Sequence, residues 1–307
     1  MENTNVITPE VKESVNLDIE AEKKKQQIRL IFKKVFTYIF LTIFAIFAIF
    51  PFYWMIITSL KSFNEYRSLV LTYFPKEIMW SNYSVVIANG ASKGTDFWRY
   101  LSTTLIVGLS STLLSVLVTI LTAYAFARLK FKGREFMFSL LLSTMMIPGE
   151  LFTITNYVTV SQMGIRSTYV VMIIPFVVSV FYIYLLRNAF KQIPDSLYQA
   201  AKVDGCGNFR YLVKVMIPLA GPTIISITLL KFIGTWNAYI WPRLVNSEAY
   251  QLLSNWVSNG FTYEGDSTAA PTLKMAAATM VTVPLLVLFL CFRKYIMRGV
   301  SRSGTKG

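Results

Sequence analysis

Residues 198–219, with the sequence YQAAKVDGCGNFRYLVKVMIPL, form a polar and basic interval between two long apolar runs. The interval predicts two short amphipathic helices, separated by a turn at Gly205. Pro194 precedes the first helix and is tolerated at a helix start, because the N–H that it lacks would have no intrahelical partner there. Four residues of the first helix fall on one face at helical spacing: Leu197, Ala200, Ala201 and Asp204. The two small alanines would let another surface approach this helix closely.

The second helix of the interval should begin at Asn208, a residue that favours the N-cap position. Its expected apolar stripe has the spacing i, i+3, i+4 and i+7 and consists of Phe209, Leu212, Val213 and Met216. Pro218 should end this helix. We therefore expect a helix–turn–helix loop over residues 194–218.

The composition is that of an integral membrane protein. The chain has 307 residues, of which 54% are hydrophobic, and a mean hydropathy of +0.49. It has no histidine, the commonest general base and metal ligand, and its two cysteines, Cys206 and Cys291, make no metal or disulfide framework. The net charge of +14 reflects basic residues beside apolar spans, so we do not expect nucleic acid as a partner.

Six apolar runs are long enough to cross the roughly 30 Å hydrocarbon core of a bilayer. They cover residues 35–57, 101–125, 136–157, 168–186, 219–241 and 272–292. The expected fold class is thus an all-α membrane protein with six transmembrane helices, in a permease domain over residues 35–294. Residues 1–34 are expected to be a flexible cytoplasmic tail that becomes an interfacial helix near residues 26–36. Residues 295–307 are expected to be a second cytoplasmic tail.

The distribution of charge predicts the orientation. The four segments expected inside hold 21 of the 30 lysine and arginine residues, and the three segments expected outside hold six. Because basic residues gather on the cytoplasmic side of membrane proteins, both termini are expected in the cytoplasm.

The loop resembles the EAA loop of ABC importer permeases. The resemblance rests on Gln199-Ala200-Ala201, then Asp204-Gly205, then twelve residues and Pro218. Gln199 stands where the family usually has glutamate, so the resemblance does not imply an ion pair there. Four further stretches, residues 123–133, 141–151, 193–205 and 235–242, resemble the maltose-type second permease of carbohydrate transporters. The resemblance implies a type I ABC importer permease fold, with this loop coupling the spans to an ATPase.

The same resemblance implies function and partners. The chain would be the permease of an ATP-driven importer for a sugar, with an oligosaccharide expected, in the plasma membrane of a bacterium or archaeon. Its partners would be a second permease in a heterodimer, two ATPase subunits, an extracytoplasmic solute-binding protein and membrane lipid. The sequence has no G-x-x-x-x-G-K-[ST] phosphate loop, so the ATPase subunits should bind ATP and magnesium. We expect no cofactor, metal or catalytic residue on this chain.

Two pairs of residues are candidates for contact with solute or binding protein. Trp236 and Asn237 lie in the run TWNAYIWP and are candidates for the substrate pathway, although an interhelical hydrogen bond is at least as common a role for such an asparagine. Trp256 and Tyr263 lie in the outer loop that resembles a segment contacting the binding protein. Aromatic residues there serve equally often in packing.

Glu150 and Lys231 are charged residues expected at membrane depth. Such residues line a pathway or pair with one another or with a partner chain. Proton coupling, and with it an ion-gradient-driven secondary transporter, remains an alternative, as does an ABC permease for a non-sugar solute such as a glycerol phosphate. A membrane-embedded enzyme is disfavoured, because the sequence has no H-E-x-x-H, G-x-S-x-G or cysteine–histidine arrangement.

Overall fold

The computed structural model describes residues 9–92, 96–246, 250–258, 261 and 270–301, and within these ranges the secondary structure is entirely helical. The chain divides into two units, residues 1–57 and residues 58–307. The expected all-α fold class is confirmed.

The first unit contains most of one long helix, α1 (Pro9–Ser59). Its part Lys24–Ser59 is long and apolar enough to cross a membrane. Residues 1–34 were expected to be a flexible tail, but in the structure the helix already begins at Pro9. The polar run before the span, EAEKKKQQ over residues 20–27, consists of good helix formers, so the helix of the span continues into it.

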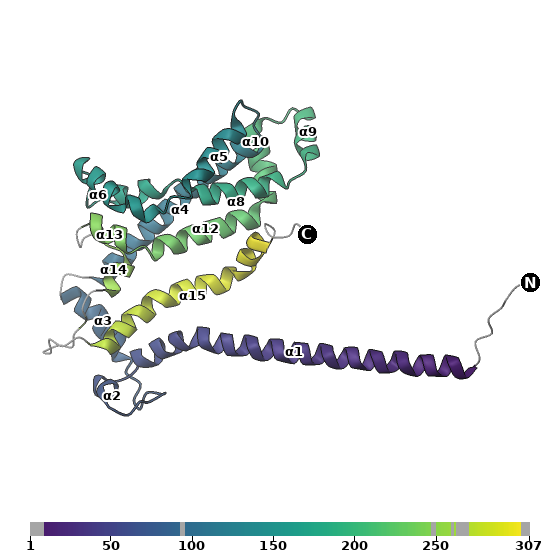
Figure 1. Cartoon of the computed structure of the whole chain (residues 1–307). Helices are drawn as coiled ribbons and strands as arrows, with labels where there is room; N and C mark the ends of the chain where they lie inside the picture. Colours follow the sequence, from purple (N-terminus) through teal and green to yellow (C-terminus); the bar gives the residue numbers. More distant parts are fainter. Residues whose placement is uncertain (1–8, 93–95, 247–249, 259–260, 262–269, 302–307) are drawn as a thin grey trace, which may run out of the picture. The chain divides into compact units, whose positions relative to one another are not determined.

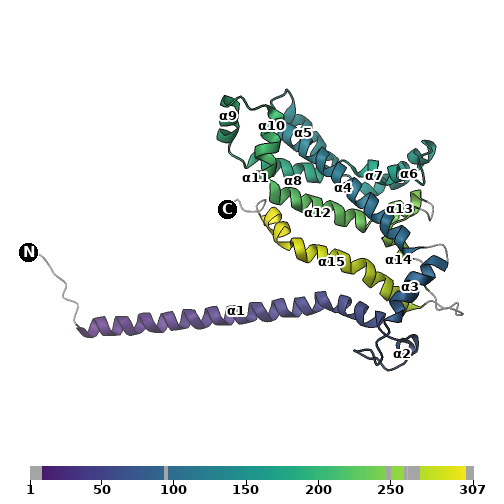
Figure 2. The same ribbon diagram turned by 180° about the vertical axis from the view of Figure 1, so that it is seen from behind.

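The second unit contains the remaining helices, shown in Figures 1 and 2. In chain order these are α2 (Phe63–Arg67), α3 (Ser81–Ser92), α4 (Phe97–Arg128), α5 (Arg134–Thr144), η1 (Gly149–Phe152), α6 (Thr153–Gln162), α7 (Tyr169–Ile173), η2 (Ile174–Phe176), α8 (Val180–Lys191), α9 (Asp195–Val203), α10 (Asn208–Tyr211), η3 (Leu212–Met216), α11 (Ile217–Leu219), α12 (Gly221–Trp236), α13 (Ile240–Val245), α14 (Leu253–Val257) and α15 (Pro271–Ser301).

The number of candidate spans among the described residues is three to six. Three unbroken helical segments qualify by length and composition, namely Lys24–Ser59, Phe97–Arg128 and Pro271–Tyr295. Three further candidates are pairs of consecutive helices with a bend between them. If each bent pair is counted as one span, the total equals the six spans expected from the sequence. The bends are 79° between α5 and η1–α6, 45° between α7–η2 and α8, and 81° between α10–α11 and α12.

Three expected spans have different boundaries in the structure. Residues 136–157 are not one straight helix, because the helix of α5 stops before Pro148, which lacks an N–H and disfavours helix at the residue before it. The span expected to reach residue 241 ends at Trp236, where Asn237 caps α12. At the other end of the unit, α15 continues to Ser301 through residues that were expected as a tail.

The core of the second unit is built around α4. This helix packs against α8 and α12, and α12 also packs against α15. In both views α9 and α10 lie at one end of the unit, while α3 and α14 lie at the opposite end (Figures 1 and 2). The helix–turn–helix loop and the expected outer loop are therefore on opposite ends of the helical unit.

Candidate functional site

Helix α9 is exposed along its whole length. None of its residues is buried, and Gln199, Ala200 and Asp204 at its end are all exposed, while Ala201 is partly buried. Val203, an apolar residue, is 88% exposed. Tyr198 and Ala201 pack one side of α9 against the core, and an amphipathic helix whose remaining surface is exposed is suited to docking against another protein.

Gly205 sets the turn after α9, as the sequence predicts. Its φ of +71° is in the left-handed region, which a residue with a Cβ rarely adopts. The backbone N–H of Gly205 donates to the carbonyl of Lys202 at 3.1 Å, and that of Cys206 donates to the carbonyl of Ala201 at 2.8 Å. This pair of bonds is the Schellman motif, which ends a helix and redirects the chain.

The second part of the loop departs from the prediction. Gly207 is the N-cap, and Asn208 is the first helical residue. The side-chain oxygen of Asn208 instead accepts hydrogen bonds from the Lys202 ammonium at 2.7 Å and the Tyr198 hydroxyl at 3.2 Å. Asn208 thus joins the two halves of the loop across the glycine turn.

Only half of the expected apolar stripe is buried. Leu212 and Met216 are in the core, whereas Phe209 is 72% exposed and Val213 is also exposed. Leu212 and Met216 belong to a core cluster that includes Tyr124 and Ala127 of α4, so the buried face of the loop is the face that packs in this cluster. As a result Tyr211 is fully buried, and Phe209 adds to the exposed apolar surface of the loop.

Pro218 does not end the second helix. It lies within α11, and the chain turns at Ala220 into α12 with a bend of 81°. Pro218 is tolerated inside the helix because it is near the start of α11, which follows a π-helical turn with altered hydrogen bonding. The loop is therefore directly continuous with a candidate span.

Arg128, the last residue of α4, anchors the loop, a role that the sequence analysis did not assign. Its guanidinium donates to the carbonyl of Phe190 at 3.0 Å and to the carbonyl of Ile193. It also forms an ion pair with Asp195, the first residue of α9. The Arg128 side chain is only 5% exposed, so this planar donor joins α4 to the junction between α8 and α9.

Three tyrosines strengthen the same attachment. The hydroxyl of Tyr124, on α4, donates to the carbonyl of Asn208 at 3.1 Å. The rings of Tyr198 and Tyr211 meet edge to face, with centroids 5.1 Å apart. The loop is thus held against the end of α4 by contacts on both sides of Gly205, while its outward surface stays free of contact within the second unit.

A cleft lies between α4, α8, α12 and α13. Its volume is ≈ 370 Å³, and its lining combines apolar and aromatic side chains with a few polar ones. The lining residues include Ser111, Phe176, Ser179, Tyr182, Lys231, Thr235 and Trp241. The Trp241 ring nitrogen donates to the carbonyl of Val171 at 3.0 Å, which fixes one wall.

Lys231 lines this cleft, whereas Glu150 does not. The Lys231 ammonium donates to the carbonyl of Phe176 at 2.8 Å and lies 5.8 Å from the centroid of the Phe176 ring. Glu150 is exposed in the short helix η1, at the break between α5 and α6. The structure therefore does not pair these two residues with each other, one of the roles considered for them.

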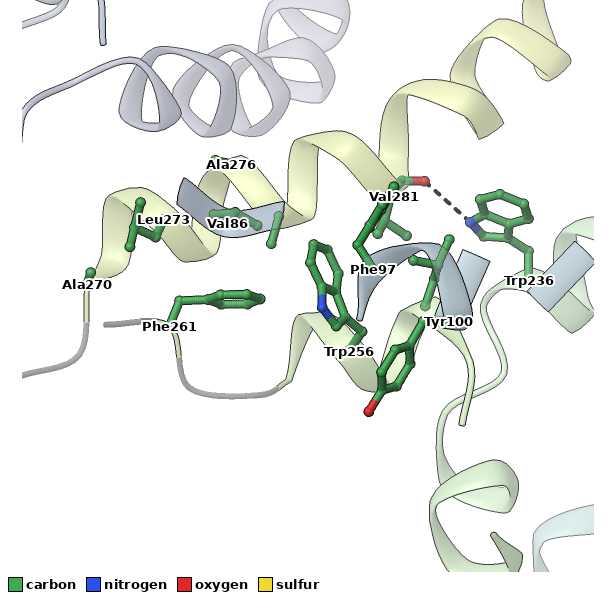
Figure 3. Packing of buried hydrophobic residues seen from close by; sticks show 12 residues of the cluster. Val86, Phe97, Tyr100, Trp236, Trp256, Phe261, Ala270, Leu273, Ala276 and Val281 are labelled. Carbon is green, nitrogen blue, oxygen red and sulfur yellow. Dashed lines mark hydrogen bonds between the residues drawn. The ribbon is translucent and has the colours of Figure 1, made fainter. Parts of the chain in front are cut away.

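The structure separates the two candidate pathway residues. Trp236 is buried, and its ring nitrogen donates to the carbonyl of Val281 on α15 at 3.3 Å (Figure 3). The side chain fills the contact between α12 and α15 in this structure, and the expected contact of Trp236 with solute stays a prediction. Asn237 is exposed at the end of α12 and remains a candidate.

Trp256 is a core residue rather than an outer contact. Its side chain is 0% exposed and packs against Phe97, with ring centroids 5.1 Å apart, and Phe261, at 5.2 Å (Figure 3). The expectation that Trp256 contacts a binding protein is therefore wrong for this conformation, because α14 is folded into the unit. Tyr263, the other candidate in this loop, lies outside the described residues.

No metal centre is found in the described ranges: they contain no group of three or more histidine, cysteine or acidic residues able to hold an ion.

Known proteins place the chain in a family. Residues 115–302 match the family described as binding-protein-dependent transport system inner membrane component. The diacetylchitobiose uptake system permease protein DasC of Streptomyces coelicolor is 29% identical, over 91% of this chain and 99% of its own length. The arabinooligosaccharides transport system permease protein AraQ of Bacillus subtilis is 27% identical, over 88% and 94%.

A solved structure supports the fold. A chain of a bacterial ABC transporter involved in the import of the acidic polysaccharide alginate matches with a TM-score of 0.75. The sequence identity is 24%, over 85% of this chain and 95% of that chain. With the family match and the apolar helices, this identifies a multi-pass membrane protein. The chain belongs to the family of binding-protein-dependent transport system inner membrane components.

Proposed function

We propose that this chain is the permease subunit of an ATP-driven ABC importer for a sugar, with an oligosaccharide as the expected solute. The observation that carries the proposal is the exposed helix α9, which is held to α4 by Arg128 and redirected by Gly205. A mobile ATPase needs such a surface to transmit its motion into the spans. The oligosaccharide is supported by the solutes that the relatives' names give.

The proposed importer has further subunits. Two ATPase subunits bind ATP and magnesium, since the sequence has no phosphate loop. A second permease completes the pathway, and an extracytoplasmic binding protein delivers the solute. Exposed apolar side chains on α5 and α6, such as Phe136, Leu140 and Ile154, are available to the second permease or to membrane lipid.

The orientation follows from the two ends of the unit. The basic residues Lys130, Lys132 and Arg134 follow Arg128 in the connection from α4 to α5, and Arg128 pairs with Asp195 of α9, so they belong to the end that carries α9. We place this end in the cytoplasm, with both termini on the same side, and the α3–α14 end outside. ATP closure of the ATPase dimer then moves α9 on one side, and the loaded binding protein acts on the other.

Two alternatives remain distinct from this proposal. An ion-gradient-driven secondary transporter would leave the exposed surface of α9 unexplained. An ABC permease for a non-sugar solute such as a glycerol phosphate would use the same coupling loop, so only the solute distinguishes it from the proposal.

Co-purification tests the proposed function. The chain is purified from gently solubilised membranes of its own organism, and ATPase activity is assayed with and without the loaded binding protein. We expect a second permease and an ATPase in the eluate, and turnover that the loaded binding protein stimulates. Recovery of the chain alone, with solute movement in vesicles driven by an ion gradient and not by ATP, would overturn the proposal in favour of a secondary transporter.

A further inference from the structure

The cleft between α4, α8, α12 and α13 has the properties of a small-ligand site. Its volume of ≈ 370 Å³ is at the lower end of the range of about 300–1,000 Å³ that ligand pockets occupy. Such a cleft has room for a small solute or for one unit of a longer one. Its walls include the rings of Phe176 and Trp241, and its polar groups come from several helices.

Lys231 provides this cleft with a positive charge that no described residue neutralises. An ammonium group has three donors, and the carbonyl of Phe176 accepts one of them. None of the ion pairs among the described residues includes Lys231, and none of the described carboxylates lines the cleft. A charge at membrane depth is costly without a partner, so its presence favours a ligand that supplies the opposite charge.

The place of Lys231 within α12 agrees with a solute as that ligand. It lies ten positions after Gly221 and five before Trp236, which correspond to about 15 Å and about 7.5 Å along the axis at 1.5 Å per residue. A solute in the translocation pathway passes the level of this residue.

A buried hydroxyl supports a ligand at the same place. Ser111, on α4, lines the cleft and is 0% exposed, and its hydroxyl oxygen has no hydrogen-bond partner in this structure. Buried polar atoms are usually paired, so this hydroxyl, in the lining of the same cleft as Lys231, is available to hydrogen-bond a ligand. Ser179 and Thr235 add further hydroxyl groups to the lining.

We infer that this cleft binds the anionic group, a carboxylate or a phosphate, of the transported solute or of one of its units, with Lys231 as the cation. This inference rests on the proposed import function, and it adds that the imported solute carries a negative charge. The alternative structural role of Lys231 is to cap the free carbonyl of Phe176 at the break between η2 and α8. That role uses one donor and predicts no selectivity between charged and neutral ligands.

Chemical footprinting of the purified complex separates these two roles. The complex is acetylated at constant ionic strength with glucose, glucuronate or glucose 6-phosphate present, and the acetylation of each lysine is followed by mass spectrometry. Lys274, exposed on α15, is the internal control. We expect one or both anions to slow acetylation of Lys231 at least threefold, with no effect of glucose and none on Lys274. The anion that protects identifies carboxylate or phosphate. The inference would be overturned if Lys231 were acetylated at the same rate with each of the three compounds, or if glucose protected it as well as the anions do.

A thermal-shift measurement on variants provides a second readout. The protecting anion should raise the unfolding temperature of the wild-type complex, of Lys231→Arg and of the control Lys274→Met, because a ligand stabilises the state that binds it. It should not raise that of Lys231→Met. A wild-type complex without a shift, or an equal shift in Lys231→Met, would contradict the inference. Co-purification and ATPase stimulation use none of these probes, so the proposed function and this inference can fail separately.

Discussion

Replacing Arg128 with methionine tests whether α4 holds α9 in place. The guanidinium makes two hydrogen bonds to backbone carbonyls, those of Phe190 and Ile193, and one ion pair with Asp195. The Arg128 side chain is buried, whereas that of Asp195 is 85% exposed. Most of the stabilisation therefore comes from the carbonyl contacts at the α8–α9 junction.

The magnitude follows from these contacts. A hydrogen bond from a charged donor contributes about 1.5–3 kcal/mol, and two of them are lost. The exposed ion pair adds less than about 1 kcal/mol. Burial of the methionine side chain offsets part of the loss, about 1–2 kcal/mol. We expect a net loss of about 2–4 kcal/mol at the junction, which increases local opening roughly 30- to 700-fold.

Hydrogen exchange of the purified transporter measures this opening. Peptides that cover α9 should exchange faster by that factor in Arg128→Met, while peptides from α12 keep their wild-type rate. The matched control is Asp195→Asn, which removes only the exposed ion pair and should change α9 exchange less than about fivefold. Wild-type exchange of α9 in Arg128→Met, or an equal acceleration in α12, would refute the anchoring role.

Three further predictions test positions where the structure gives a specific reason. Gly205→Pro should abolish ATP-driven uptake while the protein still reaches the membrane, because proline cannot adopt a φ of +71°. Gly207→Ala is the control and should retain uptake, because the φ of Gly207 is −69° and an added Cβ would meet nothing within 4 Å. Gly108→Val should reduce the free energy of unfolding by about 1–3 kcal/mol through overpacking, and so lower the unfolding temperature of the complex, because a Cβ there lies 3.0 Å from a phenylalanine ring of α12. Gly234→Ala is the control: its added Cβ meets nothing within 4 Å, so the unfolding temperature should not fall. Trp256→Ala should reduce the free energy of unfolding by about 3–5 kcal/mol and so lower the unfolding temperature, because the side chain is buried. If Trp256 had only a surface role, the variant would lose stimulation by the binding protein and keep its unfolding temperature.

The features that local sequence determines were predicted correctly. Apolar run length gave the spans, because a helix must be long enough to cross the bilayer. The turn after α9 follows from Asp204-Gly205, since glycine alone adopts the left-handed cap without strain. The small residues Ala200 and Ala201 are on an accessible helix, as their spacing indicated.

The features that depend on contacts distant in sequence were missed. Arg128 is separated from Phe190 by 62 residues, so no local pattern distinguishes it from the neighbouring basic residues. The stripe on the second loop helix was half wrong, because the face of that helix that is buried depends on its packing against α4, which is distant in sequence. Trp256 was assigned to a surface from the family resemblance of its loop, although α14 packs against α4 and α15.

One helix connects the three regions on which the proposed function depends. Near its first turns, the Thr104 hydroxyl of α4 accepts a hydrogen bond from the backbone N–H of Leu253 in α14, at 2.8 Å. Further along, Ser111 lines the cleft, and at the last residue Arg128 holds α9. Its 32 residues extend over about 48 Å without a proline. By contrast, α12 meets the loop through a bend of 81°. Because an unbroken helix moves as a rigid element, we expect α4, rather than α12, to carry displacement of α9 to the cleft and to the outer loop.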